Sequence, residues 1–279
     1  MKQLFLFLFT CNVYFINAQG IDKIQYKIVY NFKHLTDTAK QNSFFNEEQI
    51  LYVGKFSSLY TSYFRMYDDS IRRVSIAEAM NKPDNEIIDL TGKYVIRPFT
   101  YESYFINNKK NTIYKWIRFR GSNIAIEDSA KKINWQISND TKMIAKYSCQ
   151  KATGKLFGRN YTAWFTTDLP SNAGPWKLNG LCGTILEAYD DKNEVSFSFN
   201  KILNYIKPNE QVALPKDAIV MSNLKFKKMV KAFNENPEEF EKANPINSVV
   251  TVSIVKIGGG KPRAYVEEKV ANTLELDEN

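Results

Sequence analysis

The sequence has a single histidine, His34, and only three cysteines among its 279 residues. A Ser-His-Asp or Cys-His catalytic site would have to use His34, but the chain has no Gly-x-Ser-x-Gly turn to present a nucleophile to it. A zinc site needs three or four ligands at close spacing, and one histidine with distant cysteines does not supply them. We therefore predict no metal site and no cofactor, with a structural role for His34.

Long apolar runs are also missing, except at the N-terminus. There Met1-Lys2-Gln3 precedes an apolar run that ends in Asn17-Ala18, the pattern of a cleavable secretory signal peptide. The stretch is too short to span a bilayer comfortably, so a retained anchor is disfavoured. We predict an exported protein that is periplasmic, surface-associated or secreted, with residues 1–18 as signal peptide and no transmembrane segment in the mature chain.

The chain carries a formal charge of +8. A basic surface attracts anionic partners, but the lysines are scattered and many alternate with apolar residues. We therefore interpret the lysines as part of the solvent-exposed face of a sheet. Nucleic acid is not expected as a partner, since it is not a usual client outside the cytoplasm.

Aromatic residues are abundant, with 19 Phe, 16 Tyr and 4 Trp, and they favour strands. Residues 23–33 alternate strictly between apolar and polar side chains, which predicts a half-buried strand. Similar stretches, with turn residues between most of them, are 49–53, 57–67, 87–96, 101–106, 112–119, 133–137, 142–149, 160–166, 184–189 and 194–199. Short strands without long helices between them predict an antiparallel meander and a mainly β (α+β) fold.

A helical segment interrupts this pattern at about residues 222–244, where apolar residues recur at helical spacing and Pro237 opens a second helix. Two further strands, 249–257 and 263–270, follow with a glycine-rich turn between them. We predict a single β-rich domain over residues 19–271 and a frayed acidic tail over residues 272–279.

The most distinctive segment runs from Tyr147 to Glu187. Its irregular part is punctuated by glycine and proline and is long enough to carry function. The motifs in this segment are Cys149-Gln150-Lys151-Ala152, Gly158-Arg159, Asp168-Leu169-Pro170, Gly174-Pro175 and Gly180-Leu181-Cys182-Gly183-Thr184-Ile185. We expect Arg159 to pair with a nearby acidic residue.

These motifs resemble the GLPGLI family of exported proteins from Bacteroidetes-type bacteria. The naming motif departs at two positions, with Cys182 in place of Pro and Thr184 in place of Leu. The resemblance implies a curved antiparallel sheet or half-barrel with a helix, and no established activity. It also implies that the motif loop is set by Asp168, Pro170, Gly174, Pro175, Gly180 and Gly183.

Cys149 and Cys182 remain after signal removal. In an oxidising compartment they could form a disulfide, which would replace the rigidity lost with the motif proline. An unpaired, buried cysteine is the alternative.

Three functions follow from this interpretation. The leading hypothesis is non-enzymatic binding of an apolar ligand or an envelope partner protein on an aromatic-lined sheet. The second is a structural or interaction module that contacts partners through the 168–183 loop, and an exposed apolar patch around Trp176 would favour it. The third is a periplasmic hydrolase, for which Glu187 and Asp168 are the first choices as acidic groups.

Overall fold

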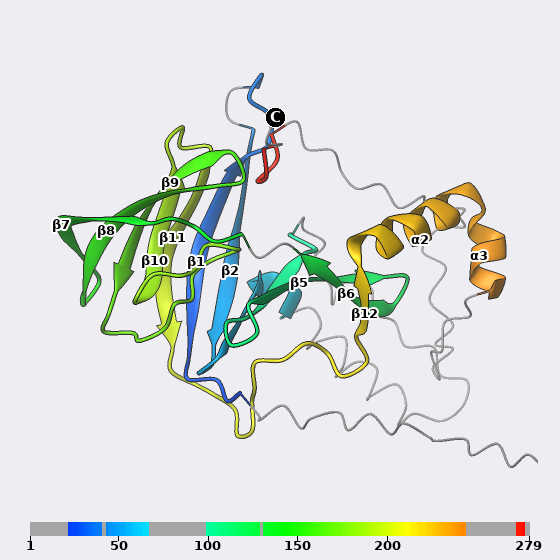
Figure 1. The fold of residues 1–279 in the computed structure, drawn as a ribbon, viewed down its shortest axis with the longest axis horizontal. Coiled ribbons are helices and arrows are strands. Elements are labelled where there is room, and N and C mark those ends of the chain that lie inside the picture. Colours follow the sequence, from blue (N-terminus) through cyan, green and yellow to red (C-terminus); the bar gives the residue numbers. More distant parts are fainter. Residues whose placement is uncertain (1–21, 41–42, 67–98, 129–130, 244–271, 277–279) are drawn as a thin grey trace, which may run out of the picture.

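The computed structural model describes residues 22–40, 43–66, 99–128, 131–243 and 272–276, and these form one open, curved sheet (Figure 1). The strand order is β12-β6-β5-β4-β3-β2-β1-β11-β10-β9-β8-β7. The strands are β1 (Tyr26–Leu35), β2 (Phe44–Val53), β3 (Ser57–Ser62), β4 (Ser103–Asn107), β5 (Thr112–Phe119), β6 (Ser122–Asp128), β7 (Gln136–Ile144), β8 (Tyr147–Leu156), β9 (Arg159–Thr166), β10 (Thr184–Asp190), β11 (Val195–Leu203) and β12 (Ile219–Ser222).

Neighbouring strands of the sheet are antiparallel, except that β12 pairs with β6 in parallel. Most connections are hairpins between consecutive strands, as the short alternating segments predict. The mainly β fold with a curved antiparallel sheet is confirmed.

One turn falls where the sequence pattern predicts continuous strand, and two predicted turns fall inside strands. Ala145 has a φ of +50° and begins the β7–β8 turn, within the strand predicted over residues 142–149. Gly154 lies inside β8, where a Cβ would stand 2.7 Å from the Ile133 side chain. Asn139-Asp140 lies in the irregular register of β7 rather than in a turn.

Figure 1 shows β7 to β11 with β1 and β2 as a strongly curved half of the sheet. Its core is aromatic because alternate residues of adjacent strands share one face. Tyr30 and Phe32 of β1 lie beside Phe197 of β11, and the rings of Phe32 and Phe197 stack with centroids 5.1 Å apart.

The predicted helical segment is present as α2 (Asn223–Glu235) and α3 (Pro237–Ala243). The Ser222 hydroxyl caps α2 by accepting a hydrogen bond from the Lys225 backbone N–H. The helix buries Phe226 and Phe233 against Phe119 of β5, with ring centroids 6.0 and 5.5 Å apart.

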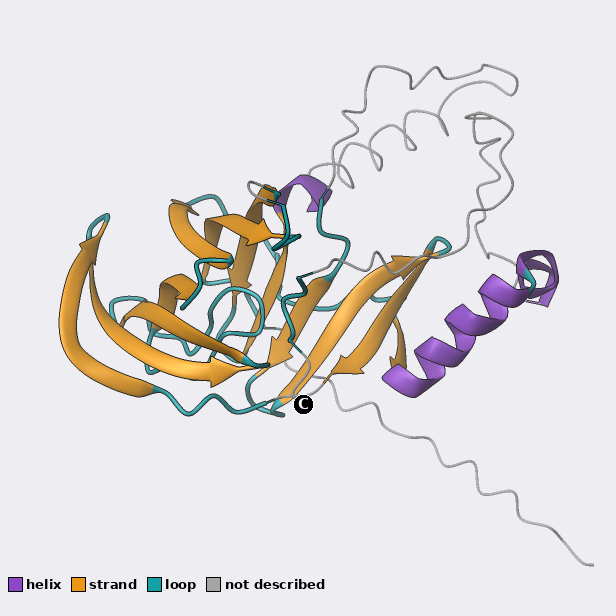
Figure 2. Cartoon of the chain, turned by 90° about the horizontal axis from the view of Figure 1, so that it is seen from above, coloured by secondary structure: helices purple, strands orange, loops and turns teal. Residues whose placement is uncertain are grey.

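The helix α2 does not lie inside the curve of the sheet. It packs on β6 and β12 at the opposite end from β7, as Figures 1 and 2 show. The aromatic face of β1 and β8 to β11 must therefore be covered by something else.

Several predictions concern residues outside the described ranges: the signal peptide 1–18 and the strands 87–96, 249–257 and 263–270. The division into a domain over 19–271 and a tail stays a prediction. Residues 63–66 are helical rather than the end of a strand. The described residues contain no helix that is long and apolar enough to cross a membrane.

Candidate functional site

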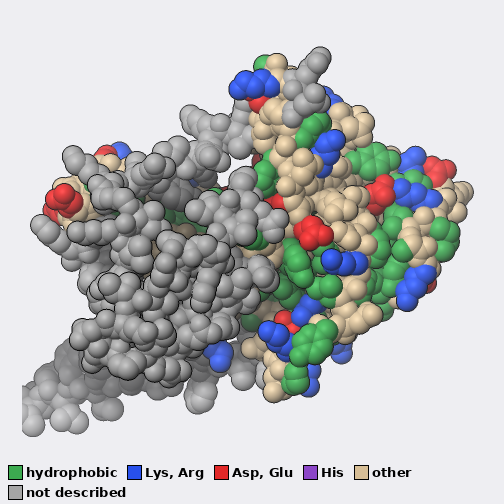
Figure 3. Space-filling model, turned by 180° about the vertical axis from the view of Figure 1, so that it is seen from behind, with side chains coloured by type: hydrophobic (Ala, Val, Ile, Leu, Met, Phe, Trp, Pro, Cys, Tyr) green, Lys and Arg blue, Asp and Glu red, His purple; other side chains and the backbone are tan. Residues whose placement is uncertain are grey.

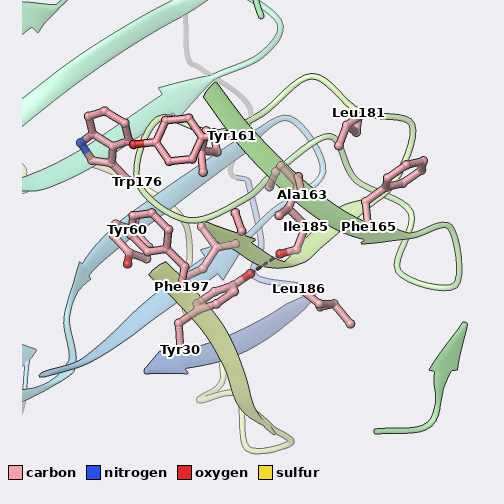
Figure 4. Close-up of a cluster of buried hydrophobic side chains, with 14 of the residues drawn as sticks. Tyr30, Tyr60, Tyr161, Ala163, Phe165, Trp176, Leu181, Ile185, Leu186 and Phe197 are labelled. Atoms are coloured by element: carbon pink, nitrogen blue, oxygen red, sulfur yellow. Dashed lines mark hydrogen bonds between the residues drawn. The ribbon is translucent and has the colours of Figure 1, made fainter. Parts of the chain in front are cut away.

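The motif loop, residues 167–183, connects β9 to β10 and folds back onto the curved half of the sheet. Its Ala173, Trp176, Leu178 and Leu181 are buried in the same cluster as the strand aromatics. Figure 4 shows the Trp176 ring beside Tyr161, and the ring centroids are 6.4 Å apart. The loop therefore fills the aromatic face that α2 leaves open.

Trp176 is only 1% exposed, so it forms no exposed apolar patch of the kind that would favour the interaction-module hypothesis. The physical reason is that the loop turns inward. The Gly180 N–H donates to the Asn172 carbonyl at 2.9 Å, and the Ile185 N–H donates to the Ala173 carbonyl at 3.0 Å. These bonds close the loop on itself and carry Trp176 into the core.

The motif glycines have separate structural roles. A Cβ on Gly174 would stand 2.4 Å from the Leu178 carbonyl oxygen, and one on Gly183 would stand 2.2 Å from the Thr166 carbonyl oxygen. Gly180 instead has a φ of +94°, which L side chains rarely adopt. Pro175 is buried beside Gly174, whereas Asp168 and Pro170 are exposed at the beginning of the loop.

The disulfide predicted between Cys149 and Cys182 is wrong, because both cysteines are free. Cys182 lies between the buried Leu181 and Gly183 and is itself exposed. Cys149 is fully buried on β8. The loop thus turns the Cys182 thiol outward and the rigidity of the loop comes from backbone contacts instead.

A cluster of charged side chains surrounds the Cys149 thiol. Burial raises the pKa of Cys149 to about 11, and the charges of Glu187 and Asp168 raise it while Lys142 lowers it. Lys142 of β7 pairs with Glu187 of β10 at 2.6 Å, across the two strands that lie between them. The curvature of the sheet therefore brings Glu187 to Lys142, and Asp168 is close enough for its charge to act on the Cys149 thiol.

The Lys142–Glu187 pair is partly exposed to solvent and lies beside an aromatic ring. The side chains of Lys142 and Glu187 are 35% and 24% exposed, and the Lys142 ammonium lies 4.5 Å from the centre of the Trp164 ring. Glu187 can accept a hydrogen bond or a proton, Lys142 can donate to a carbonyl oxygen, and the indole offers a flat face to a ring. We refer to Lys142, Trp164, Asp168 and Glu187 as the acidic site.

A second polar group is buried at the far end of β9. Arg159 donates to Asp190 at 2.6 Å and to Glu194 at 2.8 Å, so its predicted pairing with an acidic residue is confirmed. The Arg159 and Asp190 side chains are 1% and 0% exposed. Nearby, His34 is buried, and burial followed by the positive charge of Arg159 lowers its pKa to about 4.

On the face seen in Figure 3, lysine and arginine side chains are interspersed with acidic and hydrophobic ones. Among the described residues, no group of three or more His, Cys, Asp or Glu side chains could hold a metal ion.

Comparison with known families identifies the family of this chain. The family model described as N-glycanase peptide, N-terminal domain matches residues 81–228, which is more than half of the chain and includes the whole acidic site. The chain belongs to this family.

The fold matches crystal structures of PNGF-II determined in two space groups, with TM-scores of 0.51 and 0.50 and 17% sequence identity in each case. Each match covers 75% of this chain and 33% of PNGF-II. The chain therefore spans about a third of the length of these solved proteins. No curated protein sequence matches it.

The N-glycanase domain family overturns the resemblance to the GLPGLI family. Gly180 and Gly183 allow the motif loop to close on itself. Loops of other families can need glycines for the same reason. The family also overturns the leading hypothesis of a non-enzymatic protein that binds an apolar ligand or partner, since an N-glycanase is a hydrolase. The aromatic side chains behind that hypothesis pack against Trp176 and its loop.

Two members of the acidic site, Lys142 and Trp164, were missed by the sequence analysis. Neither stands next to Glu187 in the chain. Trp164 is its cross-strand partner on β9, and the curvature of β7 to β10 brings Lys142 to it. The signal that was available is the alternation of β9, which puts Trp164 on the opposite face from the buried Ala163 and Phe165.

Proposed function

We propose that this protein is a hydrolase of the N-glycanase type that removes N-linked glycans from peptides. The observation that carries the proposal is the family match over residues 81–228, because it contains every residue of the acidic site. The chain spans about a third of PNGF-II, so the activity is proposed from the family and from the site rather than from the solved structures.

In the proposed reaction, water adds to the side-chain amide carbon of the glycosylated asparagine, and the bond from this carbon to the glycan nitrogen then breaks. Glu187 takes the proton from water, and Lys142 donates a hydrogen bond to the oxygen on which charge develops. Asp168, exposed at the start of the motif loop, is the second carboxyl group and returns a proton to the leaving group. Trp164 supports the face of a sugar ring.

The proposal also concerns location. The signal-peptide pattern over residues 1–18 supports export of the protein. We propose that the protein acts on glycopeptides in the periplasm or at the outer surface, where such substrates enter an envelope.

The test is incubation of the purified protein with a synthetic N-glycosylated peptide, followed by mass spectrometry of peptide and released glycan. Cleavage of the amide bond converts asparagine to aspartate, whereas cleavage between sugars leaves one sugar on the peptide, so the products identify the bond. Absence of both products at substrate saturation would contradict the proposal.

Matched variants connect the activity to the site. Glu187→Gln should lower kcat by roughly a hundredfold or more, since it removes the general base. Glu102→Gln is the control, because Glu102 also forms a partly exposed ion pair, with Lys115 at 3.1 Å, at a distant part of the same sheet. Equal loss in both variants would show that Glu187 is not catalytic.

A further inference from the structure

The C-terminal segment, residues 272–276, lies in a groove built from parts of the chain that are far apart in sequence. The Asn272 N–H donates to the Thr36 carbonyl at 3.0 Å, at the end of β1. The Leu276 N–H donates to the Phe157 carbonyl at 3.0 Å, in the β8–β9 turn. Residues 272–276 are therefore bound to the sheet.

One end of the groove recognises an asparagine side chain. Asn272 is 4% exposed, and its amide nitrogen donates to the Leu35 carbonyl at 2.7 Å and to Glu194 at 3.0 Å. Its amide oxygen accepts a hydrogen bond from Arg159, which also donates to the Thr273 carbonyl at 2.7 Å. Every donor and acceptor of this amide is thus used, and an aspartate would meet Glu194 with like charge.

The other end recognises a carboxylate. Lys177 of the motif loop is 2% exposed and forms ion pairs with Glu275 and with Asp128, the latter at 2.7 Å. The Lys177 ammonium also lies 4.6 Å from the centre of the Phe157 ring. A buried cation of this kind favours an acidic side chain three residues after the asparagine.

The groove keeps its charges balanced without the segment. Arg159 retains Asp190 and Glu194, and Lys177 retains Asp128, so departure of residues 272–276 leaves each buried cation with a carboxylate. Removal of an element is strongly destabilising when it leaves a buried charge without a partner. Here each buried cation keeps a carboxylate when residues 272–276 leave. The segment therefore resembles a bound peptide more than a part of the core.

We propose that this groove is a recognition site for an extended peptide with the pattern Asn-x-x-Glu, which the chain's own residues Asn272 to Glu275 occupy in this structure. The fitting partner is an extended acidic segment of another protein that carries the same pattern. Arg159 and Glu194 determine the preference for asparagine, and Lys177 determines the preference for the acid.

The test uses the full chain in two forms, wild type and the double variant Asn272→Ala/Glu275→Gln, which weakens the internal ligand. A fluorescent peptide with the sequence of residues 271–279 is titrated into each, and binding is followed by anisotropy. We expect the double variant to bind the peptide at least about tenfold more tightly than the wild type, whose groove is occupied. Peptides with Asn→Ala or Glu→Gln at the two recognition positions should each bind about tenfold more weakly.

Failure of the double variant to bind the peptide, or equal binding of all three peptides, would overturn the proposal. Hydrogen exchange of the wild-type chain provides a readout that requires no variant. The amides of Asn272 and Leu276 should exchange by local release, at least tenfold faster than the amides of β9. Exchange of both groups only on global unfolding would show that the segment is an integral part of the fold.

Discussion

Gly183 and Thr166 lie so close together that a Cβ on Gly183 would stand 2.2 Å from the Thr166 carbonyl oxygen. This contact joins the last residue of the motif loop to the end of β9, and the loop closes over the core at this point. The rest of the motif loop depends on this contact, because Trp176 of the same loop is buried in the core.

Gly183→Ala should therefore destabilise the protein by about 2–4 kcal/mol, since backbone atoms rather than a flexible side chain must move. Gly180→Ala is the matched control, because a Cβ there meets nothing closer than 4.0 Å. Its cost should be about 1 kcal/mol, from the positive φ alone. Urea denaturation followed by tryptophan fluorescence measures both, and equal costs would contradict the close-contact argument.

The two free cysteines should differ greatly in reactivity. Cys182 is exposed and should react with a thiol reagent in the native protein, whereas Cys149 should react only after unfolding. Burial raises the pKa of Cys149 to about 11, so little thiolate forms near pH 8. A titration that finds one fast thiol in buffer and two in denaturant is expected. If neither thiol reacts until a reductant is added, the cysteines are bonded and the prediction fails.

His34 should make the protein sensitive to mild acid. Its folded pKa is about 4 against an ordinary value of 6.5, so the unfolded chain binds a proton in this interval that the folded chain does not. Stability from this group is complete above pH 6.5 and is lost as the pH falls from 6.5 to 4, by up to roughly 3 kcal/mol.

His34→Gln should flatten the pH dependence of the unfolding free energy between pH 6.5 and 4. Glu194 acts in a lower interval. Burial opposes its ionisation, but hydrogen bonds from Arg159 and Asn272 lower its pKa below 4.5, so its stabilisation is lost only in stronger acid. Urea denaturation at several pH values separates the two groups, and an unchanged slope in the variant would exclude His34 as the cause.

Phe119 should hold α2 on the sheet, because its ring contacts Phe226, Phe233 and Phe240 edge-on. Phe119→Ala should cost about 3–5 kcal/mol and increase hydrogen exchange throughout α2. Leu224→Ala on the same helix is the control, since Leu224 is 65% exposed and should change stability by less than about 0.5 kcal/mol. Unchanged exchange in the Phe119 variant would show that α2 is held elsewhere.

The sequence predicts most strands because alternation records which face of each strand is buried. It misses the turn after Ile144 because no glycine, proline, asparagine or aspartate stands between Ile144 and Tyr147 to mark it. It assigns Gly154 to a turn, although glycine is needed there so that Ile133 and Trp135 can pack against the strand. It misses β12 because four residues in parallel pairing depend on a partner, β6, that is distant in the chain.

The site is less predictable for the same reason. Glu187 and Asp168 are visible in the sequence because they flank the motif loop, but the pairing of Glu187 with Lys142 depends on sheet curvature. The burial of Trp176 depends on a loop that folds inward, and no local pattern distinguishes that from a loop that points outward.

The irregular register of β7 has a consequence for how molecules of this protein meet each other. β7 is one outer strand of the sheet, and its pairing with β8 shifts between Ile137 and Thr141, where Ser138, Asn139 and Asp140 lie. A bulged strand with polar residues offers a poor template for a strand from another molecule. The irregular register of β7 thus helps to prevent edge-to-edge aggregation of this aromatic-rich protein.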